Sequence, residues 1–340
     1  MTTAHVQIGE ASAIPDARRA AARCAEGLGF DAHDAARVAL YATELATNLV
    51  KHGGGGDLLV QPAHGASEPS VDLLALDTGP GIADPAQSLR RGVSTTGTAG
   101  LGLTAVRAAA IAFDMYTRPG AGTVVFARIP RANAPPEPPQ AGLRYAGISV
   151  PYPGQPRSGD AWAARRHGAC LDLFVADGLG HGAAAADAAA SAVERFRQRN
   201  GLTPERLVED VHGALRHTRG AAVLVASLDP AARRVTHCGL GNVSGLILRD
   251  DRTRHLISHS GIAGHEMRRL RELTSDWAAD ALLVLHSDGL RSRWQPDAWP
   301  GLWVRHPAVI AGVLFRDLRR LRDDATVVVA GADHPHPESR

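Results

Sequence analysis

The spacing of apolar positions divides the first part of the chain into helices and short strands. Apolar residues recur three or four positions apart over 16–28 and over 31–50, which is the period of a helix with one buried face. Asp31 stands at the start of the second segment, where its carboxylate can cap the first helical turn. The alanine-rich segment 104–113 is also expected to be helical. Short apolar runs predict strands at 58–61, 71–76 and 122–129.

The second part of the chain has a pattern that is richer in strands. Short apolar runs predict strands at 145–151, 170–176, 221–228, 235–238, 245–248, 282–285 and 326–330. Helical spacing predicts helices at 183–197, 204–216 and 307–321. No internal repeat relates the two parts. Helices and strands thus occur in both, and the expected fold class is α+β with two domains.

A proline-rich segment separates these two parts. Four prolines fall within five positions between 135 and 139, and they remove backbone donors and favour an extended spacer. A strand is expected on each side, so the segment joins two finished units. We therefore expect a first domain at 1–131, a linker at 132–141, a second domain at 142–332 and a polar tail at 333–340.

Composition narrows the class of protein. Of the 340 residues, 44% are hydrophobic and 21% are charged, which is typical of a soluble globular protein. The net charge of +2 is too small to indicate nucleic-acid binding. The three cysteines show no CxxC spacing, which favours a reducing compartment. No segment approaches the roughly 18 apolar residues of a membrane span. We expect a cytoplasmic protein without nucleic-acid or membrane partners.

Polar residues and glycines in the first domain predict a nucleotide site. Glu44 and Asn48 are four positions apart on a helix, so their side chains lie one turn apart on one face. Such a pair can orient a hydroxyl and complete the shell of a Mg²⁺ ion. Asp77 ends an apolar strand, where its carboxylate can accept from the exocyclic amine of adenine. Gly79 and Gly81 then permit the close approach of a flat ring.

A second run of glycines predicts the phosphate end of this site. Gly97, Gly100 and Gly102 lead into a helix, where free N–H groups converge on the place of a phosphate chain. Each feature alone has an ordinary alternative, the solvated face of a helix or a flexible turn. Their order along the chain, completed by Gly122 and Thr123, is more specific than any one of them.

This order resembles the GHKL ATPase superfamily over residues 10–130, and within it the small serine kinases of the anti-sigma-factor type. The resemblance implies a Bergerat α/β sandwich that binds ATP and Mg²⁺. It implies Glu44 as catalytic base, Asn48 as Mg²⁺ ligand and Asp77 as the reader of adenine. ATP contacts are further implied for Asn48, Lys51, Gly79, Gly81, Gly97, Gly100, Gly102 and Thr123. For Lys51, a surface position without a ligand is an equal alternative.

Acidic residues in the second domain predict a divalent metal site. Asp177, Asp288 and Asp323 each stand beside an expected strand, and Asp160 is a fourth candidate. An aspartate next to a glycine is usually a turn residue, but acids from distant strands can also form a carboxylate cage. Ligation by oxygen alone favours Mg²⁺ or Mn²⁺ over zinc. Two such ions can share a water and lower its pKa for attack on a phosphate ester.

This set resembles the PPM-type metal-dependent serine/threonine phosphatases, in the compact SpoIIE-like branch, over residues 142–332. The resemblance implies an αββα sandwich with two Mn²⁺ or Mg²⁺ ions. The implied ligands are Asp160 and Asp177 as bridges, the Gly178 carbonyl, and Asp288 and Asp323 at the second ion, with Asp324 as the alternative to Asp323. His181 is expected beside the ions or at the surface. Arg157 is expected to meet the substrate phosphate or to lie free at the surface.

Together the resemblances imply a bifunctional partner-switching regulator in bacterial stress or sigma-factor signalling. The first domain would phosphorylate a serine or threonine of a STAS-domain protein, of the anti-sigma antagonist or stressosome type, and the second would dephosphorylate it. An anti-sigma factor or sigma factor is a further expected partner. One alternative is a first domain that binds ATP and sequesters a partner without turnover, fused to an active phosphatase. Another is that only the phosphatase is active.

Overall fold

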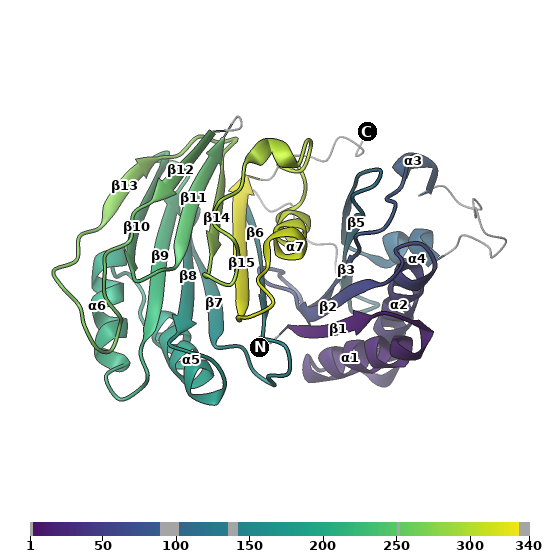
Figure 1. Cartoon of the computed structure of the whole chain (residues 1–340), viewed down its shortest axis with the longest axis horizontal. Helices are drawn as coiled ribbons and strands as arrows, with labels where there is room; N and C mark the ends of the chain where they lie inside the picture. The colour runs from purple at the N-terminus through teal and green to yellow at the C-terminus, as the bar shows by residue number, and fades with distance from the viewer. Residues whose placement is uncertain (1–2, 89–101, 135–141, 250–251, 333–340) are drawn as a thin grey trace. The chain divides into compact units, whose positions relative to one another are not determined.

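The computed structural model (Figure 1) describes residues 3–88, 102–134, 142–249 and 252–332. Gly97, Gly100, most of the expected linker and the expected tail lie outside the described residues. Contacts divide the chain into two compact units. The first consists mainly of Thr3–Pro139 with Ala308–Arg316, and the second of Gln140–Pro307 with Asp317–Arg340. No helix within the described ranges is long and apolar enough to cross a membrane.

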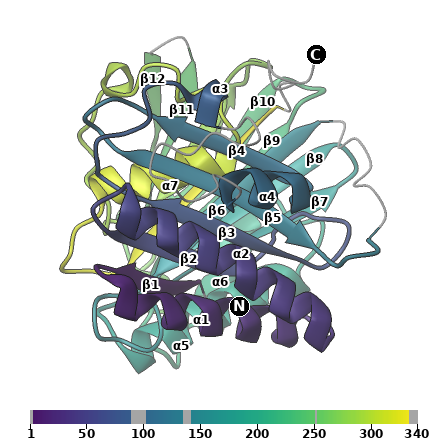
Figure 2. The ribbon, with the colours of Figure 1, turned by 90° about the vertical axis from the view of Figure 1, so that its right-hand side faces the viewer.

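The first unit contains an antiparallel sheet of five strands in the order β1-β2-β3-β5-β4. The strands are β1 (Ala4–Ile8), β2 (Gly56–Pro62), β3 (Ser70–Leu76), β4 (Ala112–Thr117) and β5 (Thr123–Pro130). The helices are α1 (Ile14–Gly27), α2 (Ala32–Lys51), α3 (Pro85–Ser88) and α4 (Gly102–Ala109), with a 3-10 turn at Ala11–Ala13. Helices α1 and α2 pack on each other and on one face of the sheet, as Figure 2 shows.

The core of this unit lies between α2 and the sheet. Val38 and Leu45 of α2 are fully buried against Leu58 of β2 and Leu73 of β3. Asp31 caps α2 by accepting a hydrogen bond from the backbone N–H of Asp34 at 2.8 Å, which confirms its predicted role. A cap of this kind stabilises a helix by about 1 kcal/mol.

One predicted helix was wrong in its extent. The segment 104–113 divides between α4, which ends at Ala109, and β4, which begins at Ala112. Phe113 pairs with Ala127 across the sheet, and Met115 packs in the same core two positions later. The alternate burial of these large side chains outweighs the helical propensity of the preceding alanines.

The second unit contains two antiparallel sheets of five strands, in the orders β13-β10-β9-β8-β7 and β12-β11-β14-β15-β6. The first sheet comprises β7 (Asp160–His167), β8 (Cys170–Gly178), β9 (Ala221–Asp229), β10 (Arg234–Leu240) and β13 (Leu273–Asp276). The second comprises β6 (Leu143–Val150), β11 (Ser244–Arg249), β12 (Arg252–Leu256), β14 (Leu282–His286) and β15 (Ala325–Ala332). The helices of this unit are α5 (Ala183–Gln198) and α6 (Pro204–Ala214), with a 3-10 turn at Pro296–Ala298. Helix α7 (Pro307–Leu318) follows along the chain, but its residues Ala308–Arg316 belong to the first unit by their contacts.

Strand β8 serves two cores at once. Leu173 and Val175 pack against Leu285 and Val328 of the second sheet, so the two sheets face each other. Phe174 lies on the opposite face of β8 and packs against residues of α5 and α6. Because both faces of β8 are buried, its sequence is almost continuously apolar rather than alternating. The α+β fold class with two domains is confirmed.

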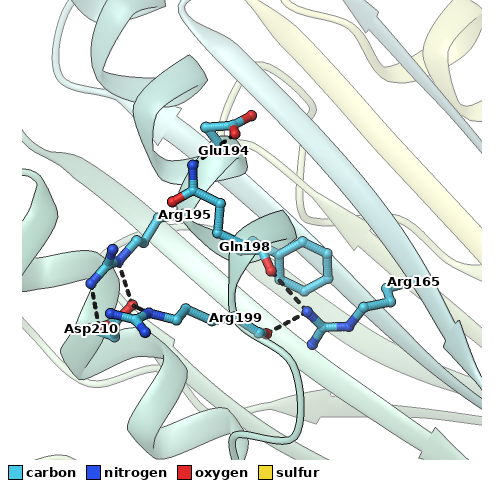
Figure 3. Close-up of polar contacts among 7 residues, drawn as sticks. Arg165, Glu194, Arg195, Gln198, Arg199 and Asp210 are labelled. Atoms are coloured by element: carbon cyan, nitrogen blue, oxygen red, sulfur yellow. Dashed lines mark hydrogen bonds and ion pairs between the residues drawn. The ribbon is translucent and has the colours of Figure 1, made fainter.

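A group of charged residues fixes the end of α5 (Figure 3). Arg165 of β7 donates hydrogen bonds to the carbonyl of Phe196 at 2.8 Å and to the carbonyl of Arg199. Arg195 donates two hydrogen bonds to Asp210 of α6, at 2.5 and 2.8 Å. These contacts tie the last turn of α5 to a strand on one side and to a helix on the other.

Candidate nucleotide and metal sites

Asp77 follows β3, and backbone donors hold its carboxylate. Oδ1 accepts hydrogen bonds from the N–H of Gly79 at 2.9 Å and from the N–H of Thr123 at 3.1 Å. Burial raises the pKa of Asp77, while these two donors act in the opposite direction. Oδ2 accepts from no other described residue. This oxygen can therefore accept from an amine of a bound base.

Glycines allow separate backbone segments to meet around Asp77. Gly122 has φ +78°, and a Cβ atom there would lie 2.0 Å from the carbonyl oxygen of Asp77. A Cβ atom on Gly53 would lie 2.7 Å from the Cβ of Asp77. Sequence reasoning did not select Gly53, although it begins a run of four glycines directly after α2. Only glycine fits at either position.

The two glycines after Asp77 lie too close to neighbouring backbone for a side chain to fit. A Cβ atom on Gly79 would lie 2.6 Å from the carbonyl oxygen of Gly53. Gly81 has φ +72°, and its Cβ would lie 2.1 Å from the carbonyl oxygen of Arg118. Thr123 is buried, and its hydroxyl lies 3.0 Å from that of Thr117.

Glu44 and Asn48 lie one turn apart on α2, and both are half-buried. A Cβ atom on Gly102 would lie 2.4 Å from Oε2 of Glu44. The carboxylate therefore lies against the first residue of α4, where backbone N–H groups have no partner within the helix. The structure thus brings Glu44 and Gly102 together. Lys51 is the last residue of α2 and is exposed.

In the second unit, Asp160 and Asp177 face each other on neighbouring strands. They are paired in the antiparallel register of β7 and β8. Asp160 is only 5% exposed, and its Oδ2 has no hydrogen-bond partner among the described residues. The N–H of Gly178 donates to the carbonyl of Gly159 at 2.9 Å, so the backbones of the two strands stay close at this end.

Asp323 and Asp324 occupy different environments just before β15. Asp324 is 2% exposed; its Oδ1 accepts from the N–H of Tyr152 at 2.7 Å, whereas Oδ2 has no partner among the described residues. Asp323 is half-buried, and its carboxyl group interacts with that of Asp288. Asn242 donates to Oδ2 of Asp288 at 2.7 Å. Sequence reasoning did not identify Asn242.

Burial and mutual repulsion raise the pKa values of these acids. The pKa of Asp177 is raised well above its usual range, first by burial and then by the charges of Asp160, Asp288, Asp323 and Asp324. The pKa of Asp160 is raised mainly by burial. Negative charge is therefore costly at this point of the unit unless a cation or protons compensate it.

The residues present fit a hard divalent cation. Within the described ranges, no three or more His, Cys, Asp or Glu side chains already converge as a ligand set. Five acids nevertheless perturb one another, and two buried oxygens, Oδ2 of Asp160 and Oδ2 of Asp324, lack donors. Carboxylate oxygens that repel each other and have no donors are suitable ligands for Mg²⁺ or Mn²⁺, which would draw them together.

Hydroxyl groups that the sequence did not single out surround Asp160. Oγ1 of Thr326 donates to Oγ of Ser149 at 2.8 Å, and Oγ of Ser287 accepts from the N–H of Thr326 at 3.0 Å. The hydroxyls of Ser287 and Thr326 lie close to Asp160 and lower its pKa, against the effect of burial. Their only signal in the sequence is their position beside the predicted acids.

Two further predicted residues, His181 and Arg157, have exposed side chains. His181 is exposed, and its ring stacks on that of Tyr152 with the centroids 5.9 Å apart. Arg157 forms an exposed ion pair with Asp187 at 2.8 Å.

Two family models match the chain. Residues 9–129 match the model described as a histidine kinase-like ATPase domain, and residues 167–333 match the model described as stage II sporulation protein E, SpoIIE. Two curated relatives come from Bacillus subtilis (strain 168). Serine/threonine-protein kinase RsbT is 32% identical over 112 residues, which are 33% of this chain and 84% of the relative. Phosphoserine phosphatase RsbX is 23% identical over 133 residues, which are 39% of this chain and 67% of the relative.

Solved structures agree with the second match. A structure described under "The bacterial stressosome: a modular system that has been adapted to control secondary messenger signaling" is 25% identical with a TM-score of 0.52. The match covers 55% of this chain and 98% of the chain in that structure. The crystal structure of RsbX in complex with magnesium is 20% identical with a TM-score of 0.50. The match covers 56% of this chain and 96% of the RsbX chain, and it supports the fold alone.

The expected GHKL-like and PPM-type resemblances are thereby confirmed. The chain belongs to the histidine kinase-like ATPases through its first domain, and its second domain is a PPM-type (PP2C) domain of the SpoIIE kind.

Proposed function

We propose that this protein adds a phosphoryl group to a serine or threonine of a STAS-domain protein with its first domain and removes that group with its second. The observation that carries the proposal is that one chain holds two separate acid sites. One is Glu44 of α2, whose carboxylate lies against the first residue of α4, and the other is the cluster around Asp160 and Asp177. The likeness of the two domains to a serine/threonine kinase and to a phosphoserine phosphatase supports opposite reactions.

In the first domain, ATP would bind with its base against Asp77. Oδ2 of Asp77 accepts from the adenine amine, while Gly79 and Gly81 leave room for the ring. Glu44 would take the proton of the substrate hydroxyl as the hydroxyl oxygen attacks the γ-phosphorus, and the bond from that phosphorus to the bridging oxygen would break to release ADP. The amide oxygen of Asn48 would hold Mg²⁺, which neutralises charge on the phosphates when bound.

The remaining expected contacts of this domain lie at the phosphate end. We assign phosphate contacts to Lys51 and to the backbone N–H groups of Gly102, Gly97 and Gly100, the last two outside the described residues. Thr123 lies behind the base, because its N–H donates to Asp77.

In the second domain, the acid cluster would hold two Mg²⁺ or Mn²⁺ ions. Asp160 and Asp177 would be shared ligands of the ions, and the carbonyl of Gly178, Asp288 and one of Asp323 and Asp324 would be the further ligands. When bound, the ions supply a water of lowered pKa that can attack phosphorus in line. The protein's own contribution is to orient the ligands. Asn242 fixes Asp288 by a hydrogen bond, and the hydroxyls of Ser287 and Thr326 lie beside Asp160.

The proposed substrate is a STAS-domain protein of a partner-switching circuit, with an anti-sigma or sigma factor as a further partner. The likeness to RsbT and to a stressosome structure supports this choice. A phosphate on such a protein adds nearly two negative charges, which can make or break an interface with a partner.

The kinase half is tested in the full chain carrying Asp177→Asn, so that phosphate is not removed again. With radiolabelled ATP and Mg²⁺, label should pass to a protein in a panel of STAS-domain proteins. Adding Glu44→Gln should lower the rate by about 10²- to 10⁴-fold and leave ATP binding intact. ATP binding without transfer to any of the proteins would contradict the kinase and favour a partner-sequestering module.

The phosphatase half is tested with p-nitrophenyl phosphate and Mn²⁺. Hydrolysis should disappear in EDTA and in the variants Asp177→Asn and Asp288→Asn. Asp276→Asn is the matched control, because Asp276 is an exposed acid at the end of β13. Full hydrolysis by both site variants would show that the cluster is not the active site.

A further inference from the structure

A groove of about 820 Å³ lies next to the acid cluster, within the second unit. Leu179, Gly180 and Ala184 form one part of its lining, and Arg219 and His265 form another. Gly180 follows Gly178 by two positions, so the groove begins on the loop that leads from the proposed metal site into α5. When the phosphate of a protein substrate reaches that site, the residues next to the phosphate must lie beside it. The groove is one of the surfaces on which these residues can lie.

Backbone contacts fix the wall that carries Arg219. The carbonyl of Arg219 shares a hydrogen bond with Nε2 of His265 at 2.9 Å. Ala221 and Ala263 exchange two backbone hydrogen bonds, at 3.0 and 2.9 Å. Gly220 has φ +78°, and its Cβ would lie 2.6 Å from the carbonyl oxygen of Ala263. The wall is therefore preorganised, which lowers the entropic cost of binding a ligand to it.

The side chain of Arg219 is exposed and has no internal partner. Its guanidinium forms no hydrogen bond or ion pair with any residue that the structure describes. Nη1 lies only 3.3 Å from the position of a Cβ atom on Gly180. Asp187, the acid in the lining of the groove, is paired with Arg157. Arg219 thus places an uncompensated positive charge at the edge of the groove.

An apolar contact surface accompanies this charge. Leu179 is 46% exposed, although its backbone N–H is held by the carbonyl of Gly220 at 3.0 Å. Ala184 lies beside it in the lining of the groove. An apolar side chain next to a cation is complementary to a peptide segment that carries both apolar and acidic side chains.

We propose that this groove binds the peptide segment next to the phosphorylated residue of the protein substrate. Leu179 contacts an apolar side chain of that segment, and Arg219 contacts a carboxylate. This inference rests on the phosphatase function proposed above and deepens it, because it names the sequence that the domain selects. Arg219 is a positioning residue that acts on the substrate chain, outside the reacting atoms.

The test uses the full chain loaded with Mn²⁺ and synthetic phosphoserine peptides. The peptides carry leucine beside the phosphoserine and are flanked by glutamate, alanine or lysine. The wild type should favour glutamate over lysine by about threefold in kcat/KM, because a solvent-exposed ion pair is weak. Arg219→Glu should reverse this order through KM, with kcat changed by less than about twofold.

Two further variants sharpen the test. Arg197→Glu changes the net charge of the domain equally, and Arg197 is exposed in the last turn of α5, outside the groove. This variant should keep the wild-type order of peptides. Leu179→Ser should raise KM for peptides with leucine more than for the same peptides with serine in its place.

The results separate this inference from the phosphatase function. An unchanged order of peptides in Arg219→Glu overturns the inference while hydrolysis itself upholds the phosphatase. An equal loss on every peptide and on p-nitrophenyl phosphate also overturns it, because Arg219 would then contact the phosphate. A wild type that hydrolyses no phosphate ester with Mn²⁺ refutes the phosphatase function and the inference with it.

Discussion

Glycine positions decide where the carboxylate of Asp77 can lie. The strand that ends before it and the strand that begins at Thr123 approach each other at Gly122. Oδ1 of Asp77 then accepts hydrogen bonds from the N–H of Gly79, just after β3, and from the N–H of Thr123, at the start of β5. The site therefore depends on the absence of a side chain as much as on the acid itself.

Gly122→Ala should lower the free energy of unfolding of the first unit by more than about 2 kcal/mol, because a left-handed φ and a backbone clash coincide. The added Cβ would lie 2.0 Å from the carbonyl oxygen of Asp77. Gly120→Ala is the matched control. Gly120 has φ +74° with nothing within 4 Å of its Cβ, so about 1 kcal/mol should be lost. Equal losses in urea unfolding would contradict the steric account.

His212 gives the second unit a dependence on pH. Its Nδ1 accepts from the N–H of Gly264 at 3.1 Å, which requires the neutral ring. Burial lowers the pKa of His212, and repulsion by Arg216 and His265 lowers it further. The unfolded chain therefore binds this proton more readily. The stabilisation is complete above the ordinary pKa of 6.5 and is lost as the pH falls through the lower pKa of the folded state.

This dependence is measurable by urea unfolding at several pH values. His212→Gln retains an acceptor but does not titrate, so its free energy of unfolding should fall less steeply than that of the wild type below about pH 6.5. His217→Gln removes an exposed histidine and should leave the slope unchanged. Identical slopes for the wild type and His212→Gln would show that this ring does not carry the effect.

Single residues were predictable where local spacing placed them. Glu44 and Asn48 share a helix face, and Asp77 follows an apolar strand, so the sequence located all three. Asn242 was not predictable, because its partner Asp288 is 46 positions away and no local pattern connects them. The partner of a side chain across a fold depends on tertiary packing.

At the scale of elements, the described strands inside the sheets were predicted, whereas among the described edge strands only β6, which is mostly buried, was predicted. β8, β9 and β15 are nearly continuous apolar runs, because each has a neighbour on both sides and a packed face. β12 is an edge strand, and four of its five residues are exposed. Only one side of an edge strand pairs, and polar side chains there discourage pairing with other chains. Such a strand therefore lacks the run of apolar residues by which a strand is predicted from sequence.

Arg165 should be the main stabiliser of the junction between α5 and β7. Its guanidinium donates to the backbone carbonyl of Phe196 and pairs with Asp172 at 2.9 Å. The carbon of the guanidinium also lies 4.6 Å from the centroid of the Phe196 ring. Arg165→Leu removes the arginine partner of the mostly buried carboxylate of Asp172. We expect a loss of about 2–4 kcal/mol in the free energy of unfolding.

Arg197→Leu is the control for this prediction. It removes an exposed arginine from the last turn of α5, the turn to which Arg165 donates. The free energy of unfolding should change by less than about 0.5 kcal/mol. Denaturant unfolding of both variants gives the comparison. A loss in Arg165→Leu no larger than that in the control would mean that the contacts in Figure 3 do not stabilise the junction.

At the scale of the whole molecule, the acid cluster predicts stabilisation by metal ions. Repulsion among Asp177 and its neighbours opposes folding at neutral pH, and a bound cation removes it. Mn²⁺ at about 100 times its Kd should add about 2.7 kcal/mol to the stability of the second unit. Asp177→Asn should lose most of this gain in a thermal melt. Identical melting of the wild type in Mn²⁺ and in EDTA would argue against a metal site.

The two-domain organisation was predictable because each half carries an ordered set of chemical features. In the first half the set runs from Glu44 through Asp77 to Gly102, and in the second it consists of acids beside strands. The choice between Asp323 and Asp324 was not predictable, since neighbouring residues on an extended segment point in opposite directions. To tell which of two neighbouring acids faces the cluster, the register of β15 against its neighbouring strands must be known.

The central claim is that one chain adds and removes the same phosphoryl group. It is tested most directly by following phosphate on a STAS-domain substrate after a limited amount of ATP is added to the full chain with Mg²⁺ and Mn²⁺. In the wild type the phosphorylated form should rise and then fall to zero once ATP is consumed. With Asp177→Asn it should rise and persist, and with Glu44→Gln it should not rise. Phosphate that persists in the wild type as it does in Asp177→Asn, or never forms in either, would contradict the claim.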